Sequence, residues 1–276
     1  MEILVLGGTG GLGRLVCDEL GRRGVTARAF GRRDGDARDP EVVTRAAAGA
    51  KAIINCAGAS VALGGRHGWR GYHAVDTRIG VAAVAAARAH DLRLVYVGVH
   101  HPGALAGCAY VDAHERVVRA MRDIDGVVVR ATGFYSAFAA LIALARRGLL
   151  VDVGDGHART NPIDEHDLAA IVSEVAFGDG PREIAAGGPQ VLTRAEIFAQ
   201  VAARANRRVR TLRVPAWLAS CGAAGLSLLH PRIGQFGRFA AGLARHDVIA
   251  PALGTTRLAD YLASEADAPG RARARG

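Results

Sequence analysis

A glycine-rich turn between a short apolar run and a longer amphipathic run constrains the fold of this chain more than any other feature. The sequence "EILVLGGTGGLGRLVCDELGRRG" predicts a strand over residues 2–6, a tight turn, and a helix over residues 12–24. Further strands are expected over 25–30, 51–58, 93–99 and 126–133, with helices over 80–90 and 110–123. This alternation predicts a parallel sheet whose two faces are covered by helices.

The pattern defines an α/β fold, a Rossmann-type doubly wound parallel sheet with a smaller C-terminal substrate-binding lobe. We predict an NAD(P)-binding core over residues 1–153, a substrate lobe interleaved with the core over 154–263, and a disordered tail over 264–276. A very short additional strand is expected in "FGRRDGDARDP", residues 30–40, which has almost no apolar run. Thr193 and Glu196 are spaced as a capping box for a helix in the second lobe.

The glycines of the first turn have the spacing of a dinucleotide phosphate loop. Gly7, Gly10 and Gly13 form a GxxGxxG motif between the first strand and the first helix. Glycine keeps side chains away from a pyrophosphate, and the helix N-terminus offers unpaired N–H groups to the anion. The residues of this loop predicted to contact the cofactor are Gly7, Thr9, Gly10, Gly11, Leu12 and Gly13.

The end of the second strand predicts NADPH as the cofactor, with NAD less favoured. Arg32 and Arg33 follow "ARAF", where arginine accommodates a ribose 2′-phosphate, and no acid precedes Asp34. Two arginines could also occur here by chance, because the chain is rich in arginine. Further along, Asp36 and Ala37 are placed to hold the adenine. A second glycine turn beside the cofactor is expected at Cys56, Ala57 and Gly58.

A tyrosine and a histidine share one face of the predicted helix over 110–123. Tyr110 and His114 are four residues apart, so their side chains are neighbours on a helix, above an apolar stripe that includes Val117 and Met121. The pair is predicted to line the cofactor pocket, with a histidine–ribose hydrogen bond. The alternative is the half-buried edge of an ordinary helix.

Composition excludes several classes of function. The net charge is +9, but arginine is scattered, Lys51 is the only lysine, and aromatic residues are sparse, so no nucleic acid is expected as a partner. The four cysteines and ten histidines show no metal-ligand spacing, and no metal site is predicted. The N-terminus does not resemble a signal peptide and no apolar stretch is long enough to span a bilayer, so we expect a cytoplasmic protein without a transmembrane segment.

Several segments together resemble the atypical short-chain dehydrogenase/reductases, specifically the NmrA-like NAD(P)-binding group related to divinyl chlorophyllide reductases. The resemblance rests on "GGTGGLG", "NCAGASV", "YVDAHERVV", "VVVRATGFY", "GDGHARTNPIDEHDLA" and "GGPQVLTRAEI", and it extends to about residue 262. It implies that Gly133 and Phe134 approach the nicotinamide and that "NPIDEHDLA" lies where the substrate lobe folds back on the core.

Conventional members of this family have a Tyr-x-x-x-Lys motif and a serine at the end of the strand that corresponds to residues 93–99. Two of these three residues are absent from this chain. Tyr110 matches the tyrosine, whereas His114 stands in the place of the lysine, and the serine position corresponds to Gly98 or Val99. Gly98 and Val99 are both expected to lie beside the cofactor. A neutral imidazole would activate the phenol less than an ammonium group does. His100 and His101 are alternative proton donors, although a place on the rim of the site is favoured for them.

Two functions are consistent with these residues. The first is an NADPH-dependent oxidoreductase that transfers hydride to a carbonyl or conjugated double bond of an apolar small molecule. The second is a non-catalytic NAD(P)-binding sensor or assembly factor, which the altered motif favours. The apolar stretch 216–244 could wall an apolar substrate or contact a membrane surface, but core packing is the favoured interpretation. Neither the substrate nor the oligomeric state follows from the sequence.

Overall fold

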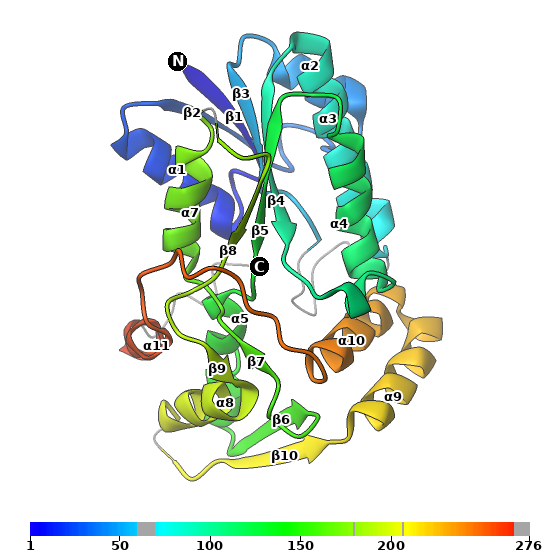
Figure 1. The fold of residues 1–276 in the computed structure, drawn as a ribbon, viewed down its shortest axis with the longest axis vertical. Coiled ribbons are helices and arrows are strands. Elements are labelled where there is room, and N and C mark those ends of the chain that lie inside the picture. Colours follow the sequence, from blue (N-terminus) through cyan, green and yellow to red (C-terminus); the bar gives the residue numbers. More distant parts are fainter. Residues whose placement is uncertain (60–69, 179, 206, 268–276) are drawn as a thin grey trace.

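A parallel sheet of six strands forms the centre of the described part of the chain. The computed structural model describes residues 1–59, 70–178, 180–205 and 207–267. The strands are β1 (Glu2–Leu6), β2 (Thr26–Phe30), β3 (Ala52–Asn55), β4 (Arg93–Val99), β5 (Gly126–Ala131) and β8 (Glu183–Ala186). They follow the order β2-β1-β3-β4-β5-β8, and each neighbouring pair is parallel (Figure 1). The predicted Rossmann-type fold is confirmed.

Helices cover both faces of this sheet, as the sequence predicted (Figure 1). One layer holds α2 (Pro40–Ala47), α3 (Arg78–His90) and α4 (Ala109–Ala120), and the other holds α1 (Gly11–Arg22) and α7 (Glu165–Glu174). Successive side chains of β1 alternate between the two cores, with Leu4 and Leu6 in the first and Ile3 and Val5 in the second. All four side chains are buried, so the strand is apolar on both faces.

The additional short strand expected in residues 30–40 is wrong. In the described residues between Phe30 and Ala52 the chain forms turns and then α2. The backbone N–H of Gly31 donates to the Asp34 carboxylate, and Asp39 caps α2 by accepting from the N–H of Glu41, with Pro40 in the first turn of the helix. Polar side chains therefore satisfy backbone groups that a strand would have paired.

The second lobe lies below the carboxyl ends of the central strands in Figure 1. Its core packs α5, α6, α8 and α11 around Leu150 and Ile197. Helix α8 begins at the predicted capping box, because Thr193 and Glu196 each accept from the other's backbone N–H. The elements of this lobe are α5 (Tyr135–Ala139), α6 (Ile142–Ala145), β6 (Leu149–Val153), β7 (Arg159–Thr160), β9 (Leu192–Thr193), α8 (Arg194–Ala203), β10 (Arg210–Val214), α9 (Ala216–Leu229), α10 (Pro231–Leu243) and α11 (Leu258–Asp267).

The predicted domain boundaries cut across these elements. Helix α7 and strand β8 come from the predicted lobe segment but pack on the central sheet, so the two parts are interleaved. Helix α11 runs to Asp267, past the predicted start of the tail at residue 264, and residues 268–276 lie outside the described part of the chain.

The apolar stretch 216–244 is divided between buried and exposed side chains. Phe239 is buried against α4, as core packing predicts. Trp217, Leu218 and Leu226 on α9 are exposed, so the expectation of core packing is wrong for them. In the described residues no helix is long and apolar enough to cross a membrane.

Candidate functional site

The phosphate loop joins the carboxyl end of β1 to the N-terminus of α1. The N–H of Gly7 donates to the carbonyl of Phe30 and the N–H of Gly10 donates to the carbonyl of Gly7, at 2.8 Å each. Gly10 is the N-cap of α1 and provides no side-chain cap, so the first N–H groups of the helix remain available to an anion.

Close backbone packing explains why glycine occupies this loop. Gly7 has a φ of +76°, and a Cβ there would lie 2.8 Å from the backbone of Ala57. A Cβ at Gly13 would overlap the carbonyl of Gly7. At Gly11 a Cβ would meet nothing within 4 Å, and at Gly10 it would meet only the carbonyl oxygen of Gly7, at 3.1 Å. The loop therefore needs Gly7 and Gly13 for its own shape, whereas Gly10 is exposed and borders open space.

Two arginines and two engaged acids mark the end of β2. Arg32 and Arg33 are exposed and make no hydrogen bond or ion pair with the described residues. Asp34 accepts from the N–H of Gly31, and the Asp36 carboxylate is held by Arg38 at 2.7–3.2 Å. The Arg38 hydrogen bonds lower the pKa of Asp36 to about 2. Both acids are thus engaged by groups of the protein, whereas the two arginines are unpaired within the described residues.

The end of β2 abuts the phosphate loop. A Cβ at Gly31 would overlap the side chain of Thr9. Arg32 and Arg33 directly follow Gly31, so they begin beside the exposed Thr9 and Gly10. Ala37, predicted to border the adenine, packs partly against the core under α2. The Asp36 carboxylate accepts hydrogen bonds from Arg38. That Asp36 also contacts the adenine remains a prediction.

The turn after β3 brings a buried aspartate to the site. Asn55 is buried and accepts from the N–H of Ala57, while Cys56 donates its N–H to the carbonyl of Leu6. Asp76 accepts from the N–H of Ala59 at 3.0 Å, and a Cβ at Gly58 would lie 2.6 Å from its Oδ1. Asp76 belongs to a π-helical turn, His73–Thr77, that precedes α3. Such turns often occur at functional sites.

Tyr110 and His114 are brought together as predicted, inside an aromatic cluster. The Tyr110 ring is half-buried, and its centroid lies 4.7 Å from that of Tyr72, 4.9 Å from that of His114 and 4.7 Å from that of Phe239. The Tyr96 hydroxyl lies 2.6 Å from Nδ1 of His114. Because neutral imidazole accepts with one nitrogen and carries its proton on the other, a donating Tyr96 leaves Nε2–H as the available donor.

Three of the unpaired buried polar atoms belong to residues of this cluster, and a fourth belongs to Asn55, which pairs with Tyr96 in the sheet. Within the described residues, the buried Tyr72 hydroxyl, Asp76 Oδ2, His114 Nε2 and Asn55 Nδ2 have no hydrogen-bond partner. Buried polar groups in native proteins are almost always paired, so an exception marks a place where a ligand or water completes the bonding. The open helix N-terminus at Gly10 and these unpaired groups are compatible with a bound dinucleotide.

Burial sets the protonation of the cluster near neutral pH. It lowers the pKa of His114 to about 4, so this imidazole is neutral, and it raises the pKa of Asp76 to about 7. Burial also raises the pKa of Tyr110 above its usual range, and the neighbouring Asp76 and Tyr72 add to the effect. The Tyr110 phenol is therefore held in its protonated form, with no cation in the place of the family's lysine.

We expect Asp76→Asn to stabilise the protein at high pH and leave it nearly unchanged at low pH. An unfolded aspartate releases its proton near pH 4, whereas folded Asp76 holds it up to about pH 7, so folding takes up a proton in between. The native protein therefore loses stability as the pH rises through this window, and the asparagine variant does not. Denaturant unfolding should show a difference near zero at pH 4 and of about 2–4 kcal/mol above pH 7.

Asp112→Asn provides the control for this measurement. Hydrogen bonds from Arg116 lower the pKa of Asp112, so its contribution to stability is present above the unfolded pKa and is lost as the pH falls. The variant should therefore be less stable than the native protein at neutral pH. A stability gain in Asp76→Asn that is the same at every pH would contradict the raised pKa of Asp76.

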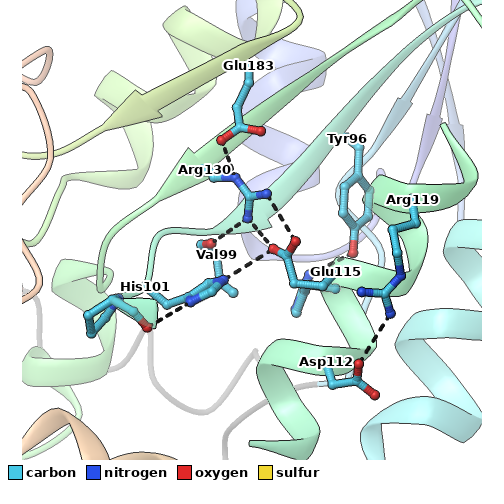
Figure 2. Close-up of polar contacts among 10 residues, drawn as sticks. Tyr96, Val99, His101, Asp112, Glu115, Arg119, Arg130 and Glu183 are labelled. Atoms are coloured by element: carbon cyan, nitrogen blue, oxygen red, sulfur yellow. Dashed lines mark hydrogen bonds and ion pairs between the residues drawn. The ribbon is translucent and has the colours of Figure 1, made fainter. Parts of the chain in front are cut away.

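An ion-pair network holds the end of β4, at the position where conventional family members have a serine (Figure 2). Arg130 bonds both Glu115 and Glu183 and donates to the carbonyl of Val99 at 3.3 Å. His101 lies between Glu115, at 3.2 Å, and the carbonyl of Pro102, at 3.1 Å. The network fixes the backbone beside the site, and Figure 2 shows His101 turned toward Glu115.

The neighbouring residues of this strand end are also engaged. Nε2 of His100 lies 2.9 Å from the carbonyl of Ile249. Gly98 is buried, and a Cβ there would lie 3.2 Å from Val128. Both histidines thus bond to protein groups, which supports a place on the rim for them.

The loop after β5 contacts the returning substrate lobe. The N–H of Ile163 donates to the carbonyl of Gly133 at 2.8 Å, and Phe134 forms an isolated parallel bridge with Ile163. The Thr132 hydroxyl donates to the carbonyl of Asn161 at 2.7 Å. The segment "NPIDEHDLA" thus meets the core at this strand end, as the resemblance implied. Gly133 and Phe134 therefore lie at the carboxyl ends of the central strands, where the glycine loop also lies.

The fold and the glycine loop define a Rossmann-type α/β protein, and the family comparison agrees. Residues 3–103 match the NAD dependent epimerase/dehydratase family. This match confirms the resemblance to the atypical short-chain dehydrogenase/reductases over that segment. No curated protein matches the sequence significantly.

Three solved structures illustrate the shared fold. The human epimerase family protein SDR39U1 with NADPH has a TM-score of 0.72 and 20% identity, over 97% of this chain and 99% of that one. The NADPH-dependent quinone oxidoreductase QOR2 of Escherichia coli with NADPH has a TM-score of 0.71 and 16% identity, over 95% and 99%. The dTDP-4-dehydrorhamnose reductase of Bacillus anthracis with NADP has a TM-score of 0.65 and 14% identity, over 78% and 84%.

Sequence reasoning missed three members of the cluster. Tyr72, Asp76 and Tyr96 lie 14 to 38 residues before Tyr110 and belong to no motif that would assign them to a site. The available signal was an aspartate within the helical pattern "YHAVDTRIGVAAV", next to the apolar residue Val75. The described residues contain no cluster of His, Cys, Asp and Glu that could hold a metal ion.

Proposed function

We infer that this protein is an NADPH-dependent oxidoreductase that transfers hydride to a carbonyl or conjugated double bond of an apolar small molecule. The observation that carries this proposal is a protonated phenol, with unpaired buried polar groups on neighbouring described residues, at the sheet end that also carries the glycine loop. The family match over residues 3–103 supports the cofactor class. NADPH, when bound, supplies the hydride and the protein supplies orientation and a proton. We also propose a cytoplasmic location. The four cysteines are free thiols, which is usual for a protein in a reducing compartment.

The cofactor would lie across the carboxyl ends of β1, β2, β3, β4 and β5. The helix N-terminus at Gly10 would hold the pyrophosphate, and Arg32 and Arg33 the 2′-phosphate. Nε2–H of His114 is available to donate to a ribose hydroxyl. The proposed contacts are Gly7, Thr9, Gly10, Gly11, Leu12, Gly13, Arg32, Arg33, Asp36, Ala37, Cys56, Ala57, Gly58, Gly98, Val99, Gly133 and Phe134.

Tyr110 is the proton donor in this proposal. Burial raises the pKa of its phenol, and the nearby Asp76 and Tyr72 add to the effect, so the phenol keeps its proton near neutral pH and can donate it to an oxygen or carbon that develops negative charge. The raised pKa also makes this phenol a weaker acid than one beside a lysine, because no cation stabilises the phenolate that donation leaves.

The walls of the cluster support an apolar substrate. Tyr110 packs with Leu105, Val111 and Phe239, a small core between α4 and α10, and with the ring of Tyr72. An apolar wall with a few convergent polar groups is typical of small-molecule sites. The similar Escherichia coli protein is a quinone oxidoreductase, and quinones belong to the class of substrate that we propose here.

A substrate screen tests the proposal directly. Oxidation of NADPH should be measured against apolar ketones, enones and quinones, with binding of NADPH followed separately by titration. Turnover of one of these compounds would support the reductase. Tight NADPH binding with no turnover of any of them would favour the second candidate.

The second candidate is a non-catalytic NAD(P)-binding sensor or assembly factor. The observation in its favour is that His114, in the place of the lysine, is neutral and hydrogen-bonded to Tyr96. Such a site can bind a dinucleotide without strongly activating the phenol. A sensor would bind NADPH with the same affinity in the native protein and in Tyr110→Phe. Neither protein would show turnover.

We expect tighter binding of NADPH than of NADH, and loss of that preference in the double variant Arg32→Ala, Arg33→Ala. Charge-assisted hydrogen bonds to the 2′-phosphate should contribute about 1.5–3 kcal/mol, or roughly a 10- to 150-fold difference in Kd. Fluorescence titration of both cofactors measures it. The double variant Arg146→Ala, Arg147→Ala, which removes another adjacent pair of exposed arginines, serves as the charge-matched control and should keep the preference. Equal affinity for both cofactors in the native protein would contradict the assignment.

A further inference from the structure

Helix α9 presents an apolar surface that nothing in the described chain covers. From Ala216 to Leu229 it has no Asp, Glu, Lys or Arg. Trp217 is 62% exposed, Leu218 48% and Leu226 45%. The opposite side of the helix packs on α10, where Ala223 lies against Gly237. At about 100° per residue, the exposed positions between 217 and 226 form one continuous arc of roughly 200°, with Trp217 near one end, Leu226 at the other and Leu218 between them.

The neighbouring two-stranded sheet carries a second set of exposed apolar side chains. β10 leads into α9 and pairs in parallel with β6, and Figure 1 shows β6, β10 and α9 along the lower rim of the molecule. Leu212 pairs with Val151, so the two side chains lie on the same face of the sheet, and Leu149 lies two residues before Val151 on that face. All three are exposed by about two-fifths or more, whereas Leu150 on the other face is buried in the lobe core.

Arginines border this surface, and acids are almost absent from it. Residues 140–151 and 204–229 contain no Asp or Glu. Their arginines are Arg146, Arg147, Arg204, Arg207, Arg208, Arg210 and Arg213. Beside Trp217, Arg213 and Arg245 line a cavity of about 760 Å³ together with Asp155 and Asp247. Asp247 is paired with Arg159 at 2.7 Å, so the charge at this end of the surface remains positive.

We propose that the surface formed by β6, β10 and α9 docks on an anionic lipid bilayer, with α9 lying in the plane of the interface. Tryptophan is enriched at membrane–water interfaces, and cationic residues beside exposed apolar side chains favour binding at an anionic headgroup boundary. Anionic phosphates complement the arginine border, and apolar chains cover Trp217 and Leu218. A second copy of this chain fits the surface less well, because a symmetric contact would bring two arginine borders together.

Membrane docking would serve the proposed reaction without depending on it. An apolar substrate partitions into the bilayer, and docking would bring it to the lobe next to the active-site cluster. The docking itself requires neither NADPH nor catalysis, so it can hold even where the proposed reductase activity fails.

Co-sedimentation with vesicles tests the proposal on the full chain. Vesicles of phosphatidylcholine and phosphatidylglycerol in equal amounts should bind the protein, vesicles of phosphatidylcholine alone should bind it much less, and added salt should release it. Leu218→Glu should lower the partition constant by about tenfold or more, since it replaces an apolar side chain that would enter the bilayer with a charged one. The matched control is Leu253→Glu, because Leu253 is a similarly exposed leucine, at 44%, outside this surface.

Tryptophan fluorescence gives a second, independent measurement. The chain has two tryptophans, Trp69 and Trp217, so a Trp69→Phe variant reports on Trp217 alone. Its emission should shift to shorter wavelength when anionic vesicles are added. No binding to either vesicle, equal binding by Leu218→Glu and Leu253→Glu, or no preference for the anionic lipid would overturn the proposal. A dimer that forms without vesicles and that Leu218→Glu abolishes would instead assign the surface to a second copy of the chain.

Discussion

Replacing Tyr110 by phenylalanine should reduce turnover roughly 10²–10⁴-fold, the usual contribution of a general acid, with NADPH affinity nearly unchanged. The substitution removes one hydroxyl and keeps the ring that packs against Tyr72, His114 and Phe239. The aromatic cluster should therefore keep its shape while the proton donor is lost. Steady-state kinetics with a substrate from the screen, together with an NADPH titration, separates these two effects.

The matched control for this variant is Tyr261→Phe. Tyr261 is a buried tyrosine on α11 that packs against Tyr135, in the core of the second lobe. Its replacement should leave turnover within a few-fold of the native value. Full activity in Tyr110→Phe would move the proton donor elsewhere, with His100 and His101 the next candidates. Of these, His101 is held by Glu115 and His100 by the carbonyl of Ile249, so each would have to break a bond in order to act.

Replacing Gly10 by valine should abolish detectable NADPH binding while the protein stays folded. Gly10 has a φ of −84°, which any residue adopts, and its Cβ would meet only the carbonyl oxygen of Gly7. The branched side chain would instead fill the space at the N-terminus of α1. Loss of two charge-assisted hydrogen bonds to a pyrophosphate corresponds to about 3–6 kcal/mol, roughly 10²–10⁴-fold in Kd. A titration beside a thermal melt measures both properties.

Gly21→Val provides the control in the same helix. A Cβ at Gly21 meets nothing within 4 Å, and the residue lies at the opposite end of α1 from the phosphate loop. The control should bind NADPH normally, and both variants should melt cooperatively. Normal NADPH binding by Gly10→Val would refute the phosphate-loop assignment. Gly13 is unsuitable for this test, because its Cβ would overlap the carbonyl of Gly7 and disturb the fold itself.

Together the two variants separate the candidate functions. A reductase loses turnover in both, but through different steps, since Gly10→Val loses the cofactor and Tyr110→Phe loses only the proton. A sensor loses NADPH binding in Gly10→Val and shows no change in Tyr110→Phe. Binding and turnover measured on the same two proteins therefore decide between them.

The sequence by itself determined the features that depend on neighbouring residues. The strands β1 to β5, the helices α1, α3 and α4, the glycine loop and the capping box at Thr193 all follow from patterns a few residues long. The contact between Tyr110 and His114 was predictable for the same reason, because helical periodicity alone puts residues four apart on one face. Local propensity also explains the main error before β3, where capping and turn residues replaced the expected short strand.

Only the tertiary structure decided which distant residues meet. The sheet order and the packing of α3 and α4 bring Tyr72, Asp76 and Tyr96 to Tyr110, and they decide that Arg130 holds Glu115. Strand β8 is four residues long and carries too short a pattern to be recognised before its partner β5 is known.

Burial was equally undetermined for α9. An apolar helical stretch has the same local pattern whether its side chains pack in a core or lie on the surface. Only the exposure of Trp217 and Leu218 in the folded chain showed which applies. Local patterns are set by the chain's own neighbours, whereas contact and exposure depend on the whole packing arrangement, which no short segment contains.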